Sequence, residues 1–244
     1  MTRVGAQPGA VSGPPPEGAV IADQPSRQIG PLAAWLVLVA LQIALAFSAT
    51  SDDDAVRDPD PLFSWELAIG GTIVYAIVVA LTFAIVKSYP MDVRSALGLK
   101  RFASRWVWIA LGVAIASLIV AVIAEPFLHG GEEQGLEPGE WQPDRAGAFV
   151  ANSLVVVLVG PFAEELFFRG LGVRVLRFLG PAVAIGGTAL LFGLAHGILG
   201  ALPPLVFFGV GLAWVRYRSD SVWPGFISHA AFNGAGIAIA IATF

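Results

Sequence analysis

Residues Trp106 to Ala124, WVWIALGVAIASLIVAVIA, contain no Asp, Glu, Lys or Arg. About 20 residues of α-helix cross the hydrocarbon core of a bilayer, so this stretch predicts a transmembrane helix. The rest of the chain agrees with that interpretation, because 56% of its 244 residues are hydrophobic and 13% are charged. Soluble domains carry about a quarter charged residues. The composition therefore predicts an integral membrane protein.

Similar charge-poor stretches lie on both sides of this segment. They predict an all-α polytopic helix bundle of about seven transmembrane helices, with no periodic polar face of the kind that soluble helices show. The stretch between Arg177 and Arg216 is short for two full crossings. We expect it to form a short hairpin whose turn, at Gly197–Gly200 and Pro203–Pro204, is buried in protein. The predicted spans are 31–49, 67–86, 106–124, 146–163, two within 178–215, and 221–244.

The basic residues predict the orientation, because Lys and Arg accumulate in cytoplasmic loops. With the N-terminus in the cytoplasm, twelve of them fall on the cytoplasmic side and two, Arg57 and Arg145, fall outside. The twelve are Arg3, Arg27, Lys87, Arg94, Lys100, Arg101, Arg105, Arg169, Arg174, Arg177, Arg216 and Arg218. This split predicts an N-terminus in the cytoplasm and a C-terminus outside.

Composition also limits the domain organisation of the chain and the kinds of site that it can form. Residues 1–29 are rich in Pro, Gly and Ala, which predicts a disordered cytoplasmic tail. Residues 30–145 are expected to form three accessory membrane helices with acidic external loops. The chain has no cysteine, which excludes disulfides, thiolate metal sites and cysteine nucleophiles. The basic residues are too scattered for a nucleic-acid-binding patch, so no nucleic-acid partner is expected.

Ionisable groups at membrane depth are costly and usually functional, and here they form three short motifs in the last third of the chain. The first is Glu164-Glu165-Leu-Phe-Phe-Arg169, in which Glu165 and Arg169 have the i, i+4 spacing of an ion pair. That pairing leaves Glu164 free to act as a base. Taken alone, the motif is equally consistent with an interfacial salt bridge.

The second motif is Phe192-Gly-Leu-Ala-His196, and the third is His229-Ala-Ala-Phe-Asn233. A single His on an apolar helix is often a packing residue, and a His–Asn pair also suits a helix–helix hydrogen bond. Glu164, His196, His229 and Asn233 together supply a base, an electrophilic His and an amide donor. These are the groups that hydrolysis by an activated water needs. We expect the four side chains to line one polar cavity.

These three motifs, in this order on the last membrane helices, resemble the CPBP family of CAAX proteases and bacteriocin-processing enzymes, also called Abi proteins. The flanking Phe168-Arg169-Gly170 and Ser221-Val222-Trp223-Pro224 agree with the resemblance. The similar region covers about 150–235, within an expected catalytic core at 146–244. The first half of the chain resembles the family only as generic spans.

The resemblance implies an intramembrane endopeptidase. Glu164 would activate water with help from His196, while His229 and Asn233 would stabilise the oxyanion. Glu165 and Arg169 would support the site. Family members are often described as metalloproteases, and Glu164, His196 and His229 could also bind a divalent metal such as Zn²⁺. The sequence leaves the metal open. The usual His-Glu-x-x-His zinc helix is absent, and the pairing of His229 with the amide donor Asn233 favours a directly activated water.

The expected partners are a peptide or protein substrate, with a membrane-embedded or lipidated end left open, and membrane lipid. The expected location is the plasma membrane, with the site open to the cytoplasm. The main alternative is a non-catalytic membrane scaffold or immunity protein of the same fold. A proton-coupled transporter is less consistent with the sequence, because the chain shows no repeat of two similar halves.

Overall fold

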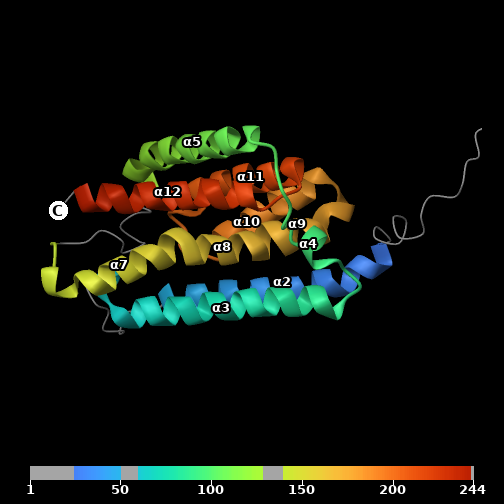
Figure 1. Cartoon of the computed structure of the whole chain (residues 1–244), viewed down its shortest axis with the longest axis horizontal. Coiled ribbons are helices and arrows are strands. Elements are labelled where there is room, and N and C mark those ends of the chain that lie inside the picture. The colour runs from blue at the N-terminus through green and yellow to red at the C-terminus, as the bar shows by residue number, and fades with distance from the viewer. Residues whose placement is uncertain (1–24, 51–59, 129–139, 243–244) are drawn as a thin grey trace, which may run out of the picture.

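The chain is all-helical in a computed structural model that describes residues 25–50, 60–128 and 140–242, and no strand occurs among these residues. The helices lie side by side along one long axis, with α5 on one face and α2 and α3 on the opposite face (Figure 1). The predicted all-α fold is confirmed.

Four long helices contact a central one, and a fifth, α5, packs on α11 and α12 instead. They are α2 (Pro25–Thr50), α3 (Trp65–Ser88), α5 (Arg105–Leu128), α11 (Leu202–Ser219) and α12 (Trp223–Ala242). Three shorter elements are α4 (Val93–Ala96), α10 (Thr188–Leu194) and the 3₁₀ turn η1 (Pro61–Phe63). A π-helical segment, η6 (Val183–Gly187), runs directly into α10.

The central helix is continuous from Pro143 to Leu179 over 37 residues. It contains two π-helical segments, η3 (Val155–Val159) and η4 (Glu165–Gly172). The other parts are η2 (Pro143–Arg145), α7 (Ala146–Leu154), α8 (Gly160–Glu164), α9 (Val173–Leu176) and η5 (Arg177–Leu179). π-Helical bulges are rare and are frequently found at functional sites.

The expectation that this span ends at Ala163 was wrong, because the helix continues through Glu164 and Glu165. The two acids therefore lie near the middle of this 37-residue helix. The physical reason lies one turn further on, where Arg169 pairs with Glu165 inside the protein. The charge therefore does not have to reach water.

Four helical segments of the described chain are long and apolar enough to cross a membrane. They are Gln28–Ala49, Trp65–Ser88, Arg105–Leu128 and Pro143–Leu179. The apolar helix Val183–Leu194 is shorter, and at 1.5 Å per residue it spans only about 18 Å. The count of seven spans and the orientation stay predictions.

The hairpin between Arg177 and Arg216 is short, as expected, but its turn lies at 195–201. Pro203 and Pro204 belong to the first turn of α11 instead. Proline is tolerated there because the first amides of a helix have no intrahelical acceptor. Of the expected tail 1–29, residues 1–24 lie outside the described residues, and α2 begins at Pro25. The acidic loop residues Asp52–Asp54, Glu132, Glu133 and Glu137 also lie outside them.

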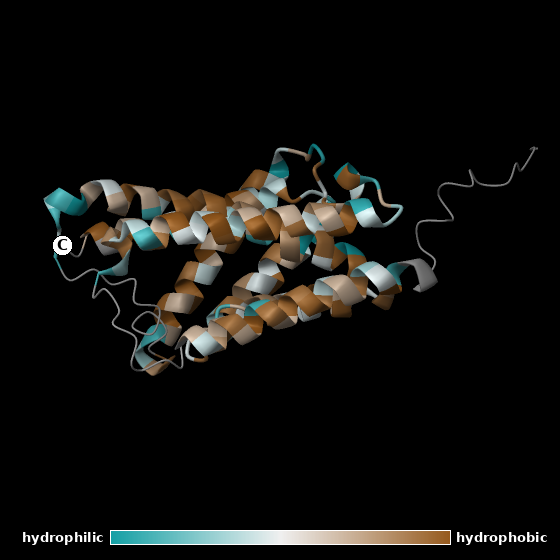
Figure 2. Cartoon of the chain, turned by 90° about the horizontal axis from the view of Figure 1, so that it is seen from below, coloured by the Kyte–Doolittle hydropathy of each residue, from teal (hydrophilic) through white to brown (hydrophobic). Residues whose placement is uncertain are grey.

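The bundle is apolar on the outside as well as inside. Trp108 and Phe127 are 74% and 79% exposed, and Figure 2 shows hydrophobic residues along the length of the helices and hydrophilic ones mainly near their ends. Such a surface fits lipid. Inside, Trp35 of α2 donates a hydrogen bond from Nε1 to the carbonyl of Phe167 at 3.1 Å, which fixes α2 against the central helix.

Candidate active site

Glu165 and Arg169 form the ion pair that their spacing predicts, with Arg169 Nη1 3.4 Å from Glu165 Oε1. Both side chains are buried, at 1% and 0% exposed. The guanidinium of Arg169 also lies 4.0 Å from the centre of the Phe192 ring, a favourable cation–π contact. Among the described residues none of its three nitrogens has a hydrogen-bond partner, so the carboxylate and the ring are its main stabilising neighbours.

His229 of α12 lies between the two acids. Its Nε2 is 3.7 Å from Glu164 Oε2, and its Nδ1 is 3.4 Å from Glu165 Oε1. The ring is buried, whereas the Glu164 side chain is 18% exposed. The two carboxylates were expected to face apart, yet one histidine reaches both because its two nitrogens point in different directions. A Cβ on Gly225 would collide with the Glu165 carboxylate, so this glycine permits the close approach of α12.

Tyr75 of α3 completes the surroundings of Glu164. Its hydroxyl donates to Glu164 Oε1 at 3.0 Å. The ring can lie this close because residue 160 is glycine, and a Cβ there would be only 2.9 Å from the ring carbon that carries the hydroxyl. The sequence motifs did not include Tyr75. The signal that could have found it is its position as the only tyrosine in the apolar run 67–86.

His196 lies in the turn after α10, and its Nδ1 is 2.8 Å from the carbonyl oxygen of Phe192. A carbonyl only accepts, so Nδ1 carries the hydrogen, and in a neutral ring Nε2 is left as an acceptor. His196 and His229 both pack edge-on against the Phe192 ring, with centroid distances of 4.7 and 5.7 Å. Phe192 therefore joins the two histidines.

Asn233 follows His229 by one helical turn, and its side-chain amide donates to the carbonyl of Val156 at 2.8 Å. The reason lies in the π-helical segment before Pro161. The Gly160 amide bonds to Val155, and Pro161 has no N–H, so the helix supplies no donor to the Val156 carbonyl. Asn233 supplies that donor and ties α12 to the central helix.

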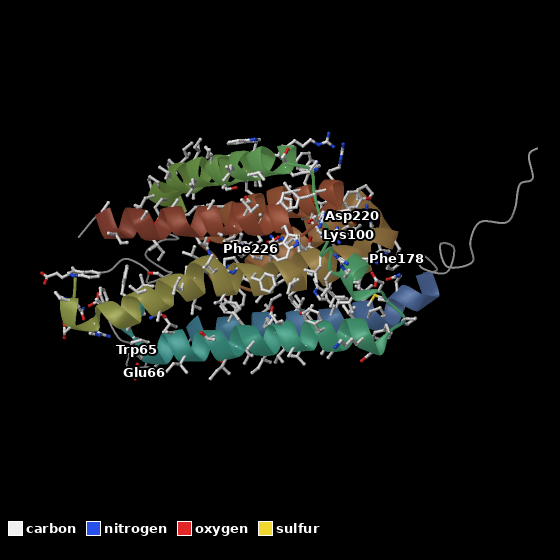
Figure 3. All side chains as sticks on the ribbon, viewed as in Figure 1. Trp65, Glu66, Lys100, Phe178, Asp220 and Phe226 are labelled. Atoms are coloured by element: carbon white, nitrogen blue, oxygen red, sulfur yellow. The ribbon has the colours of Figure 1, made fainter. Side chains whose placement is uncertain are left out.

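An apolar cavity of about 550 Å³ lies beside Glu164, between α3, the central helix and α12. Tyr75, whose hydroxyl binds Glu164, is part of its wall, so the cavity and the acid share one side chain. Phe226 lines it from α12, on the side that faces the central helix (Figure 3). The remaining lining residues are Thr72, Ala76, Val79, Ala80, Leu158, Val159, Phe162 and Ala163.

The described residues form no ready-made metal site. Within the described ranges no group of three or more His, Cys, Asp or Glu side chains is arranged to hold one. Of the three expected ligands, Glu164 and His229 approach each other, and His196, whose Nδ1 is bonded to the Phe192 carbonyl, keeps Nε2 available. The metal stays a prediction, and the mechanism proposed below uses only the side chains of the chain itself.

Part of the chain is similar to a known protein family. Residues 146–235 match the family described as type II CAAX prenyl endopeptidase Rce1-like. The match covers roughly a third of the chain and contains Glu164, Glu165, Arg169, His196, His229 and Asn233. This match supports the resemblance to the CPBP and CAAX protease family that the motifs predicted. No curated protein and no solved structure matches the chain significantly.

Proposed function

We propose that the protein is an intramembrane endopeptidase that hydrolyses a peptide bond through a water activated by Glu164 and His196. The observation that carries the proposal is the position of the Glu164 carboxylate. It is partly exposed in the middle of an apolar helix, bonded to Tyr75 and 3.7 Å from His229. The cost of such a group in hydrocarbon favours a functional role.

In the proposed reaction, Glu164 removes a proton from a water molecule, and the Nε2 acceptor of His196 orients that water. The hydroxide oxygen adds to the carbonyl carbon of the substrate, and the carbonyl oxygen becomes an oxyanion. His229 and Asn233 stabilise this charge. Glu164 then returns the proton to the leaving amine as the C–N bond breaks. Glu165 and Arg169 hold His229 and the central helix in place.

The proposed substrate is a peptide or protein with an apolar part in the membrane. The cavity between α3 and the central helix supports this choice, because its walls are almost entirely apolar and it borders Glu164 through Tyr75. Placing the apolar part there would bring a neighbouring peptide bond toward the acid. The name of the matched family points to prenylated substrates, which agree with a lipid-like occupant.

A second candidate function is a non-catalytic scaffold, and it too has observations in its favour. Asn233 bonds to a backbone carbonyl of the central helix, and His229 lies 3.4 Å from Glu165, so these groups already connect α12 to the central helix. The two functions differ at Glu164. A peptidase needs its carboxylate, whereas a scaffold tolerates its replacement by the isosteric amide.

The test is hydrolysis of membrane-anchored peptides by the purified protein in proteoliposomes, followed by mass spectrometry of the products. We expect cleavage by the wild-type chain and loss of cleavage in Glu164→Gln at equal folded yield. Equal product from both proteins, or none from the folded wild type with prenylated and non-prenylated peptides, would favour the scaffold.

Replacing Tyr75 by Phe should slow hydrolysis about tenfold with little change in folded yield. The ring still packs against Gly160, but Glu164 loses its 3.0 Å hydrogen bond, and hydrogen bonds to charged groups contribute about 1.5–3 kcal/mol. The measurement is kcat/KM for an anchored peptide. Tyr217→Phe is the matched control, because Tyr217 lies against Arg177 away from the acids. An equal effect in both variants would contradict a specific role for the Tyr75 hydroxyl.

We also propose that the basic end of the bundle faces the cytoplasm, on the strength of the twelve-to-two split of Lys and Arg. The native chain has no cysteine, so single cysteines placed at Arg94 and at Arg145 report the two sides without background. In intact cells, a membrane-impermeant thiol reagent should label residue 145 and leave residue 94 unlabelled until the membrane is opened. Labelling of residue 94 from outside would overturn the orientation.

A further inference from the structure

The end of the bundle opposite Trp65 carries a second polar cluster, which shares no residue with the candidate active site. Its centre is Asp220, the residue that ends α11 in a left-handed conformation with φ of 53°. Three cations bind this one carboxylate. Lys100 Nζ lies 2.6 Å from Oδ2, while Arg216 Nη1 and Arg177 Nη1 lie 3.0 and 3.4 Å from Oδ1. Figure 3 shows Lys100 and Asp220 side by side.

The cluster has a net positive charge, because three cations surround one carboxylate. Partial burial opposes ionisation of Asp220, but hydrogen bonds from Lys100 and Arg216 lower the pKa of its carboxyl below the ordinary value. It is therefore a single negative charge at neutral pH, set against three positive ones. Arg174 adds a further repulsion on Arg216. Arg216 is only 1% exposed, so this excess of charge is poorly screened by water.

The open side of the cluster is accessible. Lys100 and Arg177 are 39% and 38% exposed, whereas Arg216 is covered. Arg216 packs against the backbone of Gly98, which also accepts a hydrogen bond from the Val222 amide at 3.0 Å. The buried guanidinium of Arg216 thus supplies a fixed positive charge behind the two accessible cations, Lys100 and Arg177. This arrangement is complementary to an anion that approaches from outside.

The surroundings place the cluster at the depth of lipid headgroups. Trp106 lies in the first turn of α5 and Trp214 lies near the end of α11, with their ring centroids 6.0 Å apart. Trp108 and Trp223 are exposed at the same end of the helices, at 74% and 36%. Tryptophan is enriched where a membrane protein crosses the boundary between hydrocarbon and water. An anion at this depth in a membrane is most commonly the phosphate of a lipid.

We propose that Lys100 and Arg177, supported by the buried charge of Arg216, hold the phosphate of an anionic phospholipid at this end of the bundle. Basic pockets between membrane helices bind such headgroups. Asp220 keeps the cations oriented and leaves their outer hydrogen-bond donors for the lipid. The site is independent of the proposed peptidase activity.

The experiment is native mass spectrometry of the full chain, released from detergent after titration with phosphatidylglycerol or with phosphatidylcholine. The wild type should bind phosphatidylglycerol at least tenfold more tightly. Since a basic residue near an anionic surface is worth about 1 kcal/mol, the double change Lys100→Gln and Arg177→Gln should weaken binding about twenty-five-fold. The control is Arg101→Gln with Arg218→Gln, which removes the same charge from outside the Asp220 ion pairs and should change binding less than threefold.

Three results would contradict the proposed phospholipid site. One is equal binding of the two lipids by the wild type, which requires no variant and so does not depend on variant folding. Another is an equal loss in both double variants, which would indicate diffuse attraction. The third is competition by inorganic phosphate at the concentrations that bind phosphatidylglycerol, which would assign the cluster to a soluble anion. Lys100→Arg, which keeps the charge, should retain the lipid.

Discussion

Glu164→Gln is expected to reduce peptide hydrolysis about a thousandfold, because removing a general base costs about 10²–10⁴ in rate. The amide has nearly the same size as the carboxylate and still accepts a hydrogen bond from Tyr75, so the site should keep its shape. What it loses is the ability to take a proton from water. The measurement is kcat/KM for an anchored peptide in proteoliposomes, with folded protein quantified by gel filtration.

The matched control for this change is Glu66→Gln. Glu66 lies in the first turn of α3, at one end of the bundle, where it accepts a hydrogen bond from Ser64. It loses the same charge far from the acids of the site, and its activity should stay within twofold of wild type. If Glu164→Gln retained more than a tenth of the wild-type rate, Glu164 would not be the base.

Arg169→Ala should have the largest effect on stability. Removing one partner of a buried ion pair typically costs about 3–5 kcal/mol, because the other charge is left without compensation. Here that charge is Glu165, which is 1% exposed, and the change also removes the cation from the Phe192 ring. We expect a fall of about 10 °C in the apparent Tm of the purified protein, together with a lower yield in membranes.

The double variant Glu165→Gln with Arg169→Met separates charge from packing. It removes both charges and keeps most of the buried volume, so it should be more stable than Arg169→Ala alone. Arg105→Ala, at the exposed start of α5, is the control for loss of an arginine. An Arg169→Ala protein with unchanged Tm and yield would contradict the structural role of the pair.

Local spacing was sufficient to predict part of the site. Glu165 and Arg169 are separated by one helical turn, so their contact follows from helix geometry alone. The approach of Glu164 to His229 was predicted from energetic cost, since polar groups in an apolar interior are stabilised by sharing one location. The sequence did not predict that both acids approach His229, because this contact depends on where α12 crosses the central helix.

Other features depend on distant parts of the chain and left little signal. Tyr75 lies 89 positions from Glu164, and its place as the only tyrosine in the apolar run 67–86 does not indicate which residue its hydroxyl meets. The central helix also continues past Ala163, although charge patterning predicted its end there. A pattern of charges alone predicts that an apolar span ends at Glu165. The helix continues because Arg169, one turn later, pairs with Glu165 inside the protein. The proposed oxyanion role of Asn233 stays a prediction beside its observed bond to Val156.

The π-helical segment Val155–Val159 makes the site sensitive to a property that hydropathy does not measure. A π-helical turn holds an extra residue relative to an α-helix, and the Gly160 amide accordingly reaches back to Val155. Deleting one valine from this segment would remove that extra residue and tighten the turn toward α-helical geometry, so the flanking turns would keep nearly the same faces. A deletion from the α-helical turn that follows, Gly160–Glu164, would instead rotate everything before it by about 100° relative to everything after it. Val156 would then no longer face Asn233 while Glu164 faced His229. In this protein the register of the helix, as much as its composition, is therefore under constraint.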